Sequence, residues 1–501
     1  MDIIGKLGTN SAIYAATNLL QKGAAFLLMP LYTLYLDPSA YGVLSIVTAI
    51  NGLLSIAFTL GLTSAVTRFY FEYQRDPDQL AEFWGSILAF VLLLSALVGG
   101  ALLALGELVL RPLIGEVAFW PYVALGVLAA FFQPFFTTFL TVLQTRNEAR
   151  RYAVISLAHF ALTTLLTLAL VVVLGWGVVG ALIATLAAAA VFFVVSLWLL
   201  RADLKLCLRW RHLRPAFAYS LPQVPHSIAS QVTAITDRLI LNGQLGAATA
   251  GLYSVGAMVA MVVEVAAQSV NRAYVPLSMA QLKSGHPREL DQLRAVGALV
   301  VGGFCLVAAT IGVFGHELVW LLASPSFAQA AAVIPILAYC GVASSIYYLL
   351  VNVLFFDRSA IKLLPIGSLS AAGLNVSLAL MLVPRFGMQG AAVSTLLAQT
   401  LATILIASIA RRFDPIRWDY GRYAVAFGAG FIWTLMLSRL DLGGVAVTLL
   451  AKLLGLALLS TLLGALFWSR PLILFQASAR MLSRRPAEAA ALFVDRPGAI
   501  S

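Results

Sequence analysis

Long apolar runs separated by short polar connections fill the chain up to about residue 468. An α-helix rises 1.5 Å per residue, so roughly 20 apolar residues are needed to cross about 30 Å of hydrocarbon. Runs of this length predict about fourteen transmembrane helices. They lie near residues 10–32, 41–66, 83–105, 118–143, 153–174, 178–200, 219–242, 248–271, 293–315, 328–356, 362–383, 388–410, 422–440 and 444–468.

The composition supports an all-α integral membrane protein. Hydrophobic residues make up 61% of the 501 residues, charged residues 11%, and the mean hydropathy is +0.94. Soluble globular chains carry about 25% charged and under about 50% apolar residues. A water-exposed surface could not be covered with the polar residues present, so the bilayer is the expected solvent and a soluble domain is excluded.

Basic residues are concentrated in alternate connections between the predicted helices. Cytoplasmic loops of membrane proteins carry an excess of Lys and Arg, so these connections and both chain termini are expected to be cytoplasmic. The net charge of +11 is therefore an orientation signal, and nucleic-acid binding is not expected. The predicted cytoplasmic set includes Arg146, Arg150, Arg151, Arg201, Lys205, Arg209, Arg211, Arg214, Arg411, Arg412, Arg417 and Arg422, whereas Arg111, Arg385 and Arg439 fall on the opposite side.

The chain also contains an internal repeat. Residues 36–45 (LDPSAYGVLS) resemble residues 245–254 (LGAATAGLYS) at an offset of 209, and residues 177–181 (GVVGA) resemble residues 387–391 (GMQGA) at an offset of 210. Six helices per copy place both copies in the same orientation, related by an axis along the membrane normal. The predicted organisation is an N-lobe of helices 1 to 6 (1–205), a C-lobe of helices 7 to 12 (206–415), two added helices (416–468) and a basic cytoplasmic tail (469–501).

Catalytic and cofactor motifs are not expected to operate here. Residues 175–180 (GWGVVG) satisfy G-x-G-x-x-G, but they join two spanning runs instead of a strand and a helix of a soluble unit, so a tight turn is favoured over a dinucleotide site. The three cysteines stand far apart, and no metal-binding or nucleophile motif occurs. The short extracytoplasmic loops also disfavour a membrane glycosyltransferase or polymerase. We predict neither an enzyme nor a bound cofactor.

Ionisable residues inside predicted spans are the most informative positions. They are Lys22, Asp237, Arg238, Glu264 and Lys452. Each costs about 2.5–3.5 kcal/mol at a helix centre, so each should face a partner or a wet cavity. The alternative is a set of buried interhelical contacts that hold the bundle together, and this alternative is favoured for Lys452. Arg68 and Arg272, near helix ends, either line the cavity or snorkel to the surface.

Helical spacing groups polar residues with these ionisable ones. Steps of three, four or seven residues place side chains on one helix face. Asp237 and Arg238 are neighbours in sequence and lie about 100° apart on their helix, so they need separate partners. The groups are Ser11, Asn18 and Lys22; Ser227, Gln231, Arg238 and Asn242; Gln223, Ser230 and Asp237; and Glu264, Gln268 and Arg272.

Short motifs open both predicted halves. In the first half they are residues 30–32 (PLY), 37–42 (DPSAYG), 61–62 (GL) and 68–70 (RFY). In the second half they are residues 220–222 (SLP), 237–238 (DR), 245–246 (LG), 251–254 (GLYS) and 274–276 (YVP). These motifs resemble the signature of Wzx-type polysaccharide flippases, a branch of the multidrug/oligosaccharidyl-lipid/polysaccharide exporter superfamily.

The resemblance implies a V-shaped, two-lobed flippase in the bacterial inner membrane. Its expected substrate is an undecaprenyl-diphosphate-linked oligosaccharide, moved to the periplasmic leaflet for exopolysaccharide, capsule or O-antigen synthesis. Lys22 and Arg238 are the expected diphosphate partners, with Asn18 and Gln231 touching sugar. Arg68 and Arg272 complete the expected substrate-binding set, and Asp237 and Glu264 are candidate Na⁺ or proton coupling sites.

The resemblance also implies possible partners, namely a polysaccharide polymerase and a chain-length regulator. Two alternatives within the superfamily remain open. One is a multidrug/cation antiporter, although Lys22 and Arg238 would repel a cation. The other is a lipid II flippase, which has fourteen helices and a cationic cavity as well.

Overall fold

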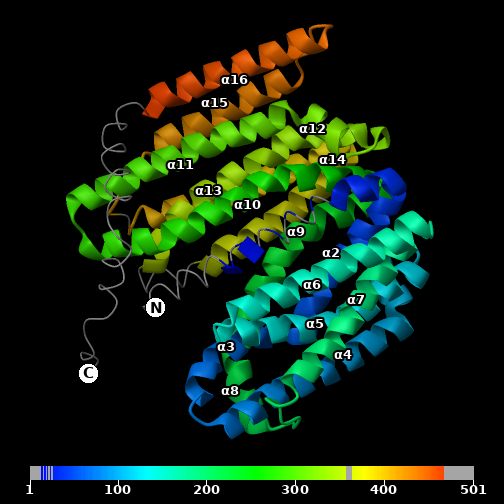
Figure 1. Cartoon of the computed structure of the whole chain (residues 1–501). Helices are drawn as coiled ribbons and strands as arrows, with labels where there is room; N and C mark the ends of the chain where they lie inside the picture. Colours follow the sequence, from blue (N-terminus) through cyan, green and yellow to red (C-terminus); the bar gives the residue numbers. More distant parts are fainter. Residues whose placement is uncertain are drawn as a thin grey trace.

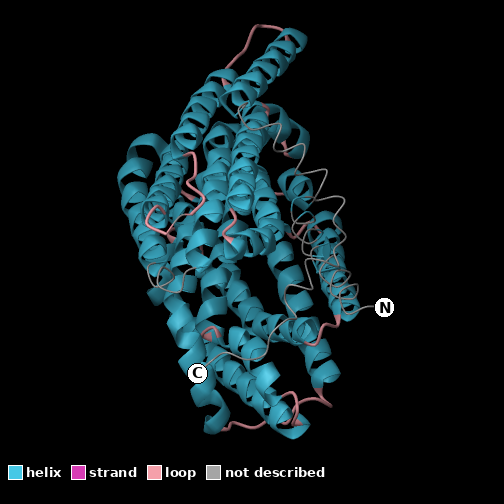
Figure 2. Cartoon of the chain, turned by 90° about the vertical axis from the view of Figure 1, so that its left-hand side faces the viewer, coloured by secondary structure: helices cyan, strands magenta, loops and turns pink. Residues whose placement is uncertain are grey.

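The computed structural model describes residues 13–14, 16–17, 20, 23, 26, 28–356, 364–413 and 415–467. The described residues form helices joined by short loops, with no strand among them (Figure 2). Ten of the helical segments are long and apolar enough to cross a membrane. The prediction of an all-helical membrane protein is therefore confirmed.

The first half of the chain contains the helices of one bundle. The first predicted span lies partly outside the described residues, and its described positions are helical. The following elements are α2 (Pro38–Thr59), α3 (Leu62–Tyr73), α4 (Pro77–Ile114), η1 (Phe119–Val123), α5 (Ala124–Thr145), α6 (Ala149–Thr167), η2 (Leu168–Val173) and α7 (Gly177–Leu200).

Within the described residues, the second half contains nine further elements and a final helix pair. Its elements are α8 (Trp210–Ser220), η3 (Leu221–Gln223), α9 (Val224–Leu245), α10 (Ala247–Ser284), α11 (Pro287–Val313), α12 (Gly315–Leu322), η4 (Pro325–Val333), α13 (Ile334–Phe356) and α14 (Leu364–Ala410). The pair is α15 (Tyr420–Ser438) and α16 (Val445–Phe467).

Three of the predicted spans differ from the observed helices. The predicted span 41–66 is two helices, because Leu60 and Gly61 both adopt positive φ angles, 44° and 72°, between α2 and α3. Only glycine takes such angles at no steric cost, so Gly61 fixes the break. Helices α4 and α10 contain 38 residues each and continue beyond the predicted spans 83–105 and 248–271. Backbone hydrogen bonding continues past the apolar run, so hydropathy alone underestimates helix length.

Within the described residues, the other predicted spans coincide with helices. The predicted spans 362–383 and 388–410 form the single long element α14, which is kinked at Gly387 (φ 57°, ψ −137°). Helix α9 is 22 residues long but is not among the ten apolar spans, since it carries Asp237, Arg238 and several other polar residues. Its polarity is explained by its position, because α9 packs against α2, α4, α10 and α14 at the junction of the two halves.

The helices form two bundles that meet at one end (Figure 1). Helices α3 to α8 belong to one bundle and α10 to α16 to the other, with α2 and α9 between them. In Figure 1 the bundles meet at the right and diverge towards the left. The right-hand ends are those that the loop charges predict to be extracytoplasmic, so this conformation is closed at that end.

The hydrophobic cores show the same asymmetry. At the predicted extracytoplasmic end, one core cluster combines residues of both halves, including Leu36 and Tyr41 with Val255 and Phe327. The rings of Tyr41 and Phe327 form an edge-to-face pair with centroids 5.7 Å apart. At the predicted cytoplasmic end, the first bundle has a core of its own, to which the second half contributes only α8 through residues such as Leu213.

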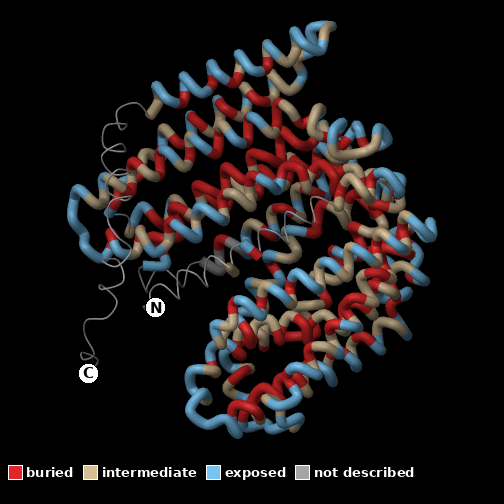
Figure 3. Tube along the Cα trace, in the orientation of Figure 1, coloured by how far each residue is buried: buried red, intermediate tan, exposed pale blue. Residues whose placement is uncertain are grey.

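Buried residues run through the interior of each bundle, and exposed residues cover the outside (Figure 3). Many of the exposed side chains are large and apolar, for example Leu108, Trp320 and Val445, each more than three-quarters exposed. In a soluble protein such a surface would promote aggregation, whereas in a bilayer it contacts lipid. The burial pattern therefore agrees with a multi-pass membrane protein.

Candidate functional site: the polar helix between the two lobes

Helix α9 carries the polar residues that the sequence singles out. Its start is set by two prolines, Pro222 and Pro225, and the short helix η3 separates it from α8. The structure places Asp237 and Arg238 in different surroundings, as their spacing on one helix predicts. Asp237 faces partners from the C-lobe, and Arg238 lies near Tyr41 of the N-lobe helix α2.

Asp237 is the centre of a buried polar cluster in the C-lobe. Its carboxylate Oδ2 accepts hydrogen bonds from the Tyr253 hydroxyl of α10 and from Thr395 Oγ1 of α14, the latter at 2.5 Å. Asn375 Nδ2, also on α14, donates to Thr395 Oγ1 at 3.1 Å. Asp237 is only 5% exposed. Three side chains from two other helices thus surround the Asp237 carboxylate.

Two oxygens of this cluster lack a partner. Asp237 Oδ1 and Asn375 Oδ1 are buried and accept no hydrogen bond from the described residues. A buried acceptor without a donor costs free energy unless a cation or a proton satisfies it. Carboxylate, amide and hydroxyl oxygens are ligands that suit hard cations. The arrangement can therefore hold a small cation or a proton.

Arg238 lies where α9 meets the N-lobe. Its side chain is half-buried, and its Nε is buried without a hydrogen-bond acceptor among the described residues. Two turns earlier on the same face, the half-buried Gln231 packs against Gly52 of α2, where an added Cβ would overlap the Gln231 amide. The two residues thus belong to the contact between the lobes, and Arg238 keeps unused hydrogen-bonding capacity there.

Glu264 lies in a second polar network, inside the C-lobe. Its Oε1 accepts hydrogen bonds from Tyr348 on α13 at 2.8 Å and from Gln268 at 3.1 Å. Nearby, Asn352 Nδ2 donates to Asn271 Oδ1 at 2.9 Å. The predicted stripe from Glu264 to Gln268 is thus present as a hydrogen bond within α10.

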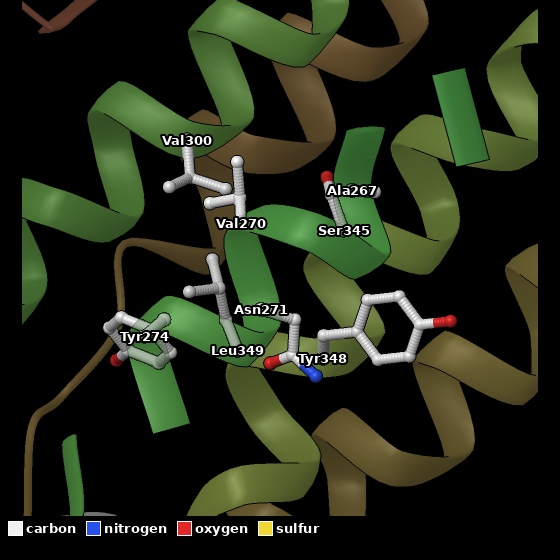
Figure 4. A pocket seen from close by; sticks show the side chains of 8 residues that line it. All are labelled: Ala267, Val270, Asn271, Tyr274, Val300, Ser345, Tyr348 and Leu349. Atoms are coloured by element: carbon white, nitrogen blue, oxygen red, sulfur yellow. The ribbon is translucent and has the colours of Figure 1, made fainter. Parts of the chain in front are cut away.

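A small pocket adjoins this second network (Figure 4). Its volume is about 10 Å³, which is enough for one water molecule and far too small for an oligosaccharide. Eight residues line it: Ala267, Val270, Asn271, Tyr274, Val300, Ser345, Tyr348 and Leu349.

The other predicted substrate-binding residues are either exposed or outside the described residues. Arg68 and Arg272 are exposed, and the Arg68 guanidinium lies 5.7 Å from the ring centre of Phe69. Asn18 and Lys22, and with them the proposed polar face of the first helix, lie outside the described residues. These residues therefore stay predictions.

Lys452 and Asn242 hold helices together. Lys452, 3% exposed, donates to Glu317 Oε1 at 2.5 Å and so links α16 to α12. Asn242 Nδ2 donates to the carbonyl oxygen of Ile114 at 2.6 Å, which links α9 to the last turn of α4. The structural role that the sequence favours for Lys452 is the one observed.

Sequence reasoning did not find the partners of the two carboxylates. Tyr253, Asn375 and Thr395 surround Asp237, and Tyr348 bonds to Glu264. All four are uncharged residues inside apolar runs, and they come from other helices. Asn375 is a polar residue at the centre of a predicted span, so the sequence does mark it. A selection restricted to ionisable residues leaves it out.

The chain matches a known family and one curated relative. The sequence profile of the polysaccharide biosynthesis protein family matches residues 7–282. A protein of the Lsg locus of Haemophilus influenzae is 25% identical over 284 residues, which cover 56% of this chain and 67% of that protein.

Solved structures of transporters share the fold. The lipid II flippase MurJ in an inward closed conformation superimposes with a TM-score of 0.69 at 12% identity, covering 92% of this chain and 99% of that one. An inward-facing multidrug resistance transporter of the MATE family, in the MOP superfamily, gives 0.65 at 16% identity over 79% and 95% of the two chains. The outward-facing conformation gives 0.54 over 81% and 96%.

These likenesses agree with the geometry of the lobes. The higher score with the inward-facing structure fits bundles that share a core cluster at the predicted extracytoplasmic end and diverge away from it. The solved neighbours are a lipid flippase and multidrug transporters. The chain belongs to the polysaccharide biosynthesis protein family and has the two-lobed fold of the MOP transporter superfamily.

Proposed function

We propose that this protein moves an undecaprenyl-diphosphate-linked oligosaccharide from the cytoplasmic to the periplasmic leaflet of a bacterial inner membrane. The product serves exopolysaccharide, capsule or O-antigen synthesis. One observation carries the proposal. Arg238 holds a half-buried guanidinium, with unused hydrogen-bonding capacity, at the junction of the lobes. A guanidinium in that position is costly unless it meets an anion, and a diphosphate is the anion that a lipid-linked saccharide carries.

The proposed cycle uses the asymmetry of the two bundles. With the lobes apart at the cytoplasmic end, the sugar headgroup enters from the cytoplasm past Arg68 and Arg272. Arg238, together with Lys22, holds the diphosphate, and Asn18 and Gln231 contact sugar hydroxyls. The prenyl tail stays in lipid throughout, so only the polar part crosses between the lobes. Closure at the cytoplasmic end and opening at the other end release it into the periplasmic leaflet.

The cluster around Asp237 is the proposed coupling site. Its two unpartnered oxygens, Asp237 Oδ1 and Asn375 Oδ1, are suited to Na⁺ or to a proton. Thr395 belongs to α14, and Asp237 lies one residue from Arg238 on α9. An ion bound at Asp237 therefore acts on the helix that carries the substrate-binding arginine. Glu264 is the second candidate, although its Oε1 already accepts two hydrogen bonds.

Polysaccharide export in cells that lack their own flippase tests the proposal. The native chain should restore export at matched protein levels, and Arg238→Ala should abolish it. Arg238→Lys should restore part of it, because the charge is kept and the fork of donors is lost. Arg111→Ala is the matched control, since Arg111 is an exposed arginine of α4. Export by Arg238→Ala equal to that of the native chain would refute the assigned site. Interaction with a polymerase and a chain-length regulator can be tested in the same strain.

The same complementation approach distinguishes two other substrates. The structural likeness to MurJ extends over 92% of this chain and 99% of that one, so lipid II is the second candidate. Rescue of a strain depleted of its lipid II flippase would favour it. An organic cation is disfavoured, because Arg238 would repel it. Drug resistance conferred by the native chain, without restored export, would overturn the proposal in favour of a multidrug antiporter.

A further inference from the structure

A groove of about 340 Å³ lies at the predicted extracytoplasmic end of the C-lobe, away from the junction of the lobes. It is formed where α11, α13 and α14 meet α12, η4 and the end of α15 (Figure 1). The N-lobe contributes none of the residues that line it. They are Gly312, His316, Ala328, Gln329, Ala331, Ala332, Pro335, Ile336, Gln389, Leu435, Ser438 and Arg439.

The polar side chains of the groove favour an anion. Arg439 and His316 supply positive or proton-donating groups, Gln329 and Gln389 supply amides, and the lining contains neither Asp nor Glu. Among the described residues, Arg439 and His316 form no ion pair. Basic residues that set the orientation of a membrane protein lie in its cytoplasmic loops. Arg439 is instead one of only three basic residues predicted on the extracytoplasmic side, so its charge does not have that role.

The surroundings of the groove favour an anion that is attached to a lipid. Trp320 follows His316 by one turn of α12 and is 77% exposed, and Met436 precedes Arg439 by one turn of α15 and is 66% exposed. Each polar residue therefore has an exposed apolar neighbour on the same helix face. The groove lies at helix ends, where lipid headgroups are found, and Trp is typical of that depth. A free anion would gain nothing from these apolar side chains.

We propose that this groove binds the phosphate of an anionic phospholipid of the extracytoplasmic leaflet. The Arg439 guanidinium and the His316 ring hold the phosphate, and Gln329 and Gln389 donate to its oxygens or to the headgroup. The acyl chains lie along Trp320 and Met436. A bound lipid would join α15 to the six-helix part of the C-lobe, because the groove is built from both. The proposal does not depend on which substrate the protein transports.

Native mass spectrometry of the purified full-length protein tests the proposal with three probes: phosphatidylglycerol, phosphatidylethanolamine and inorganic phosphate. Phosphatidylglycerol should bind more tightly than phosphatidylethanolamine. Arg439→Gln should weaken its binding about tenfold, the effect of losing one charge-assisted hydrogen-bonded contact. Gln389→Ala, which keeps the charge, should weaken it less. Arg111→Gln, on the opposite lobe, is the control and should change nothing.

Two outcomes would overturn the proposal. Unchanged phosphatidylglycerol binding in Arg439→Gln would show that the groove is not the lipid site. Inorganic phosphate that binds as tightly as phosphatidylglycerol, with the same dependence on Arg439, would show a free-anion site and remove the lipid. Arg439 is exposed and unpaired among the described residues, so its replacement is not expected to affect folding. The melting temperature of each variant without lipid verifies this point.

Discussion

Gly42 on α2 and Gly251 on α10 pack reciprocally, each against the first residue of the other helix. A Cβ added to Gly42 would overlap the carbonyl oxygen of Ala247, and a Cβ added to Gly251 would overlap that of Pro38. The two glycines occupy equivalent positions of the internal repeat. A close backbone approach between the lobes is thus made twice, by equivalent positions of the repeat, near the pseudo-twofold axis that the repeat predicts.

This contact predicts a change of conformation when either glycine is enlarged. Overpacking costs about 1–3 kcal/mol, so Gly42→Ala or Gly251→Ala should raise the population that is open at the extracytoplasmic end by about tenfold. The measurement is the labelling rate of a cysteine at Ala330, buried in the core cluster shared by the lobes, with a membrane-impermeant thiol reagent in a chain whose native cysteines are replaced. Gly373→Ala is the control, because a Cβ there meets nothing within 4 Å. Equal labelling rates in all three variants would contradict a closed extracytoplasmic contact.

The Asp237 cluster predicts ion-dependent stability. A cation bound only by the folded protein stabilises it, and at saturating Na⁺ we expect the melting temperature to rise by about 2 °C or more over choline. Asp237→Asn and Thr395→Val should remove this rise. Thr434→Val, which alters a buried threonine that contacts Tyr339, should keep it. If protons are the coupling ion, Na⁺ has no effect and the pH dependence of the melting temperature is lost in Asp237→Asn. An Asp237→Asn variant that keeps both responses would show that the site lies elsewhere.

The ion pair between Lys452 and Glu317 predicts strong coupling between two helices distant in sequence. Glu317→Gln leaves the buried Lys452 ammonium uncompensated, which should cost about 3 kcal/mol of stability. Adding Lys452→Met removes the stranded charge and should recover most of that cost. The unfolding free energies of the native chain, both single variants and the double variant give the coupling. Additive effects would mean that the pair does not hold α16 to α12.

The cytoplasmic end of the N-lobe predicts an acid-sensitive contact. Arg146 Nη1 donates a hydrogen bond to Asp203 Oδ2 at 2.9 Å, and Arg146 Nη2 forms an ion pair with Asp203 Oδ1 at 2.8 Å. The hydrogen bond from Arg146 is the main cause that lowers the pKa of Asp203 below its ordinary value of 3.8. A lowered pKa stabilises the folded state above that ordinary value and loses this contribution as the pH falls through the folded-state pKa. Asp203→Asn should therefore melt at a lower temperature than the native chain at pH 7, and this difference should disappear as the pH falls through the folded-state pKa of Asp203. A difference that persists in acid would contradict an ionic origin.

The sequence predicts the fold well, because hydropathy and helix length are local properties. The repeat between residues 36–45 and 245–254 contains both glycines of the lobe contact, Gly42 and Gly251, but it does not reveal that the two helices touch there. The break at Gly61 is missed, since the residues on both sides of it are apolar. Helix length is underestimated for α4 and α10, because both helices continue beyond the apolar run that predicts them.

The candidate site is predictable only in part. Asp237 and Arg238 stand out because a charge in an apolar run is rare, and their different environments follow from their spacing on one helix. The partners Tyr253, Asn375 and Thr395 could not be assigned, since uncharged polar residues are common in spans and their proximity depends on how three helices pack. Lys452 carries the same sequence signal as Arg238, yet it is paired and buried, so charge in a span alone does not distinguish a site from a structural contact.

The most direct test of the transport proposal uses the purified protein in liposomes that carry a polyprenyl-diphosphate-linked oligosaccharide in one leaflet. The fraction of saccharide accessible to an enzyme added outside is followed with time. The native chain should equilibrate the lipid between leaflets, and Arg111→Ala should match it. Arg238→Ala should reduce the transfer rate at least about a hundredfold, because it removes a contact between a guanidinium and a diphosphate in a low dielectric. No transfer by the native chain, or equal transfer by Arg238→Ala, would contradict the proposed function of this site.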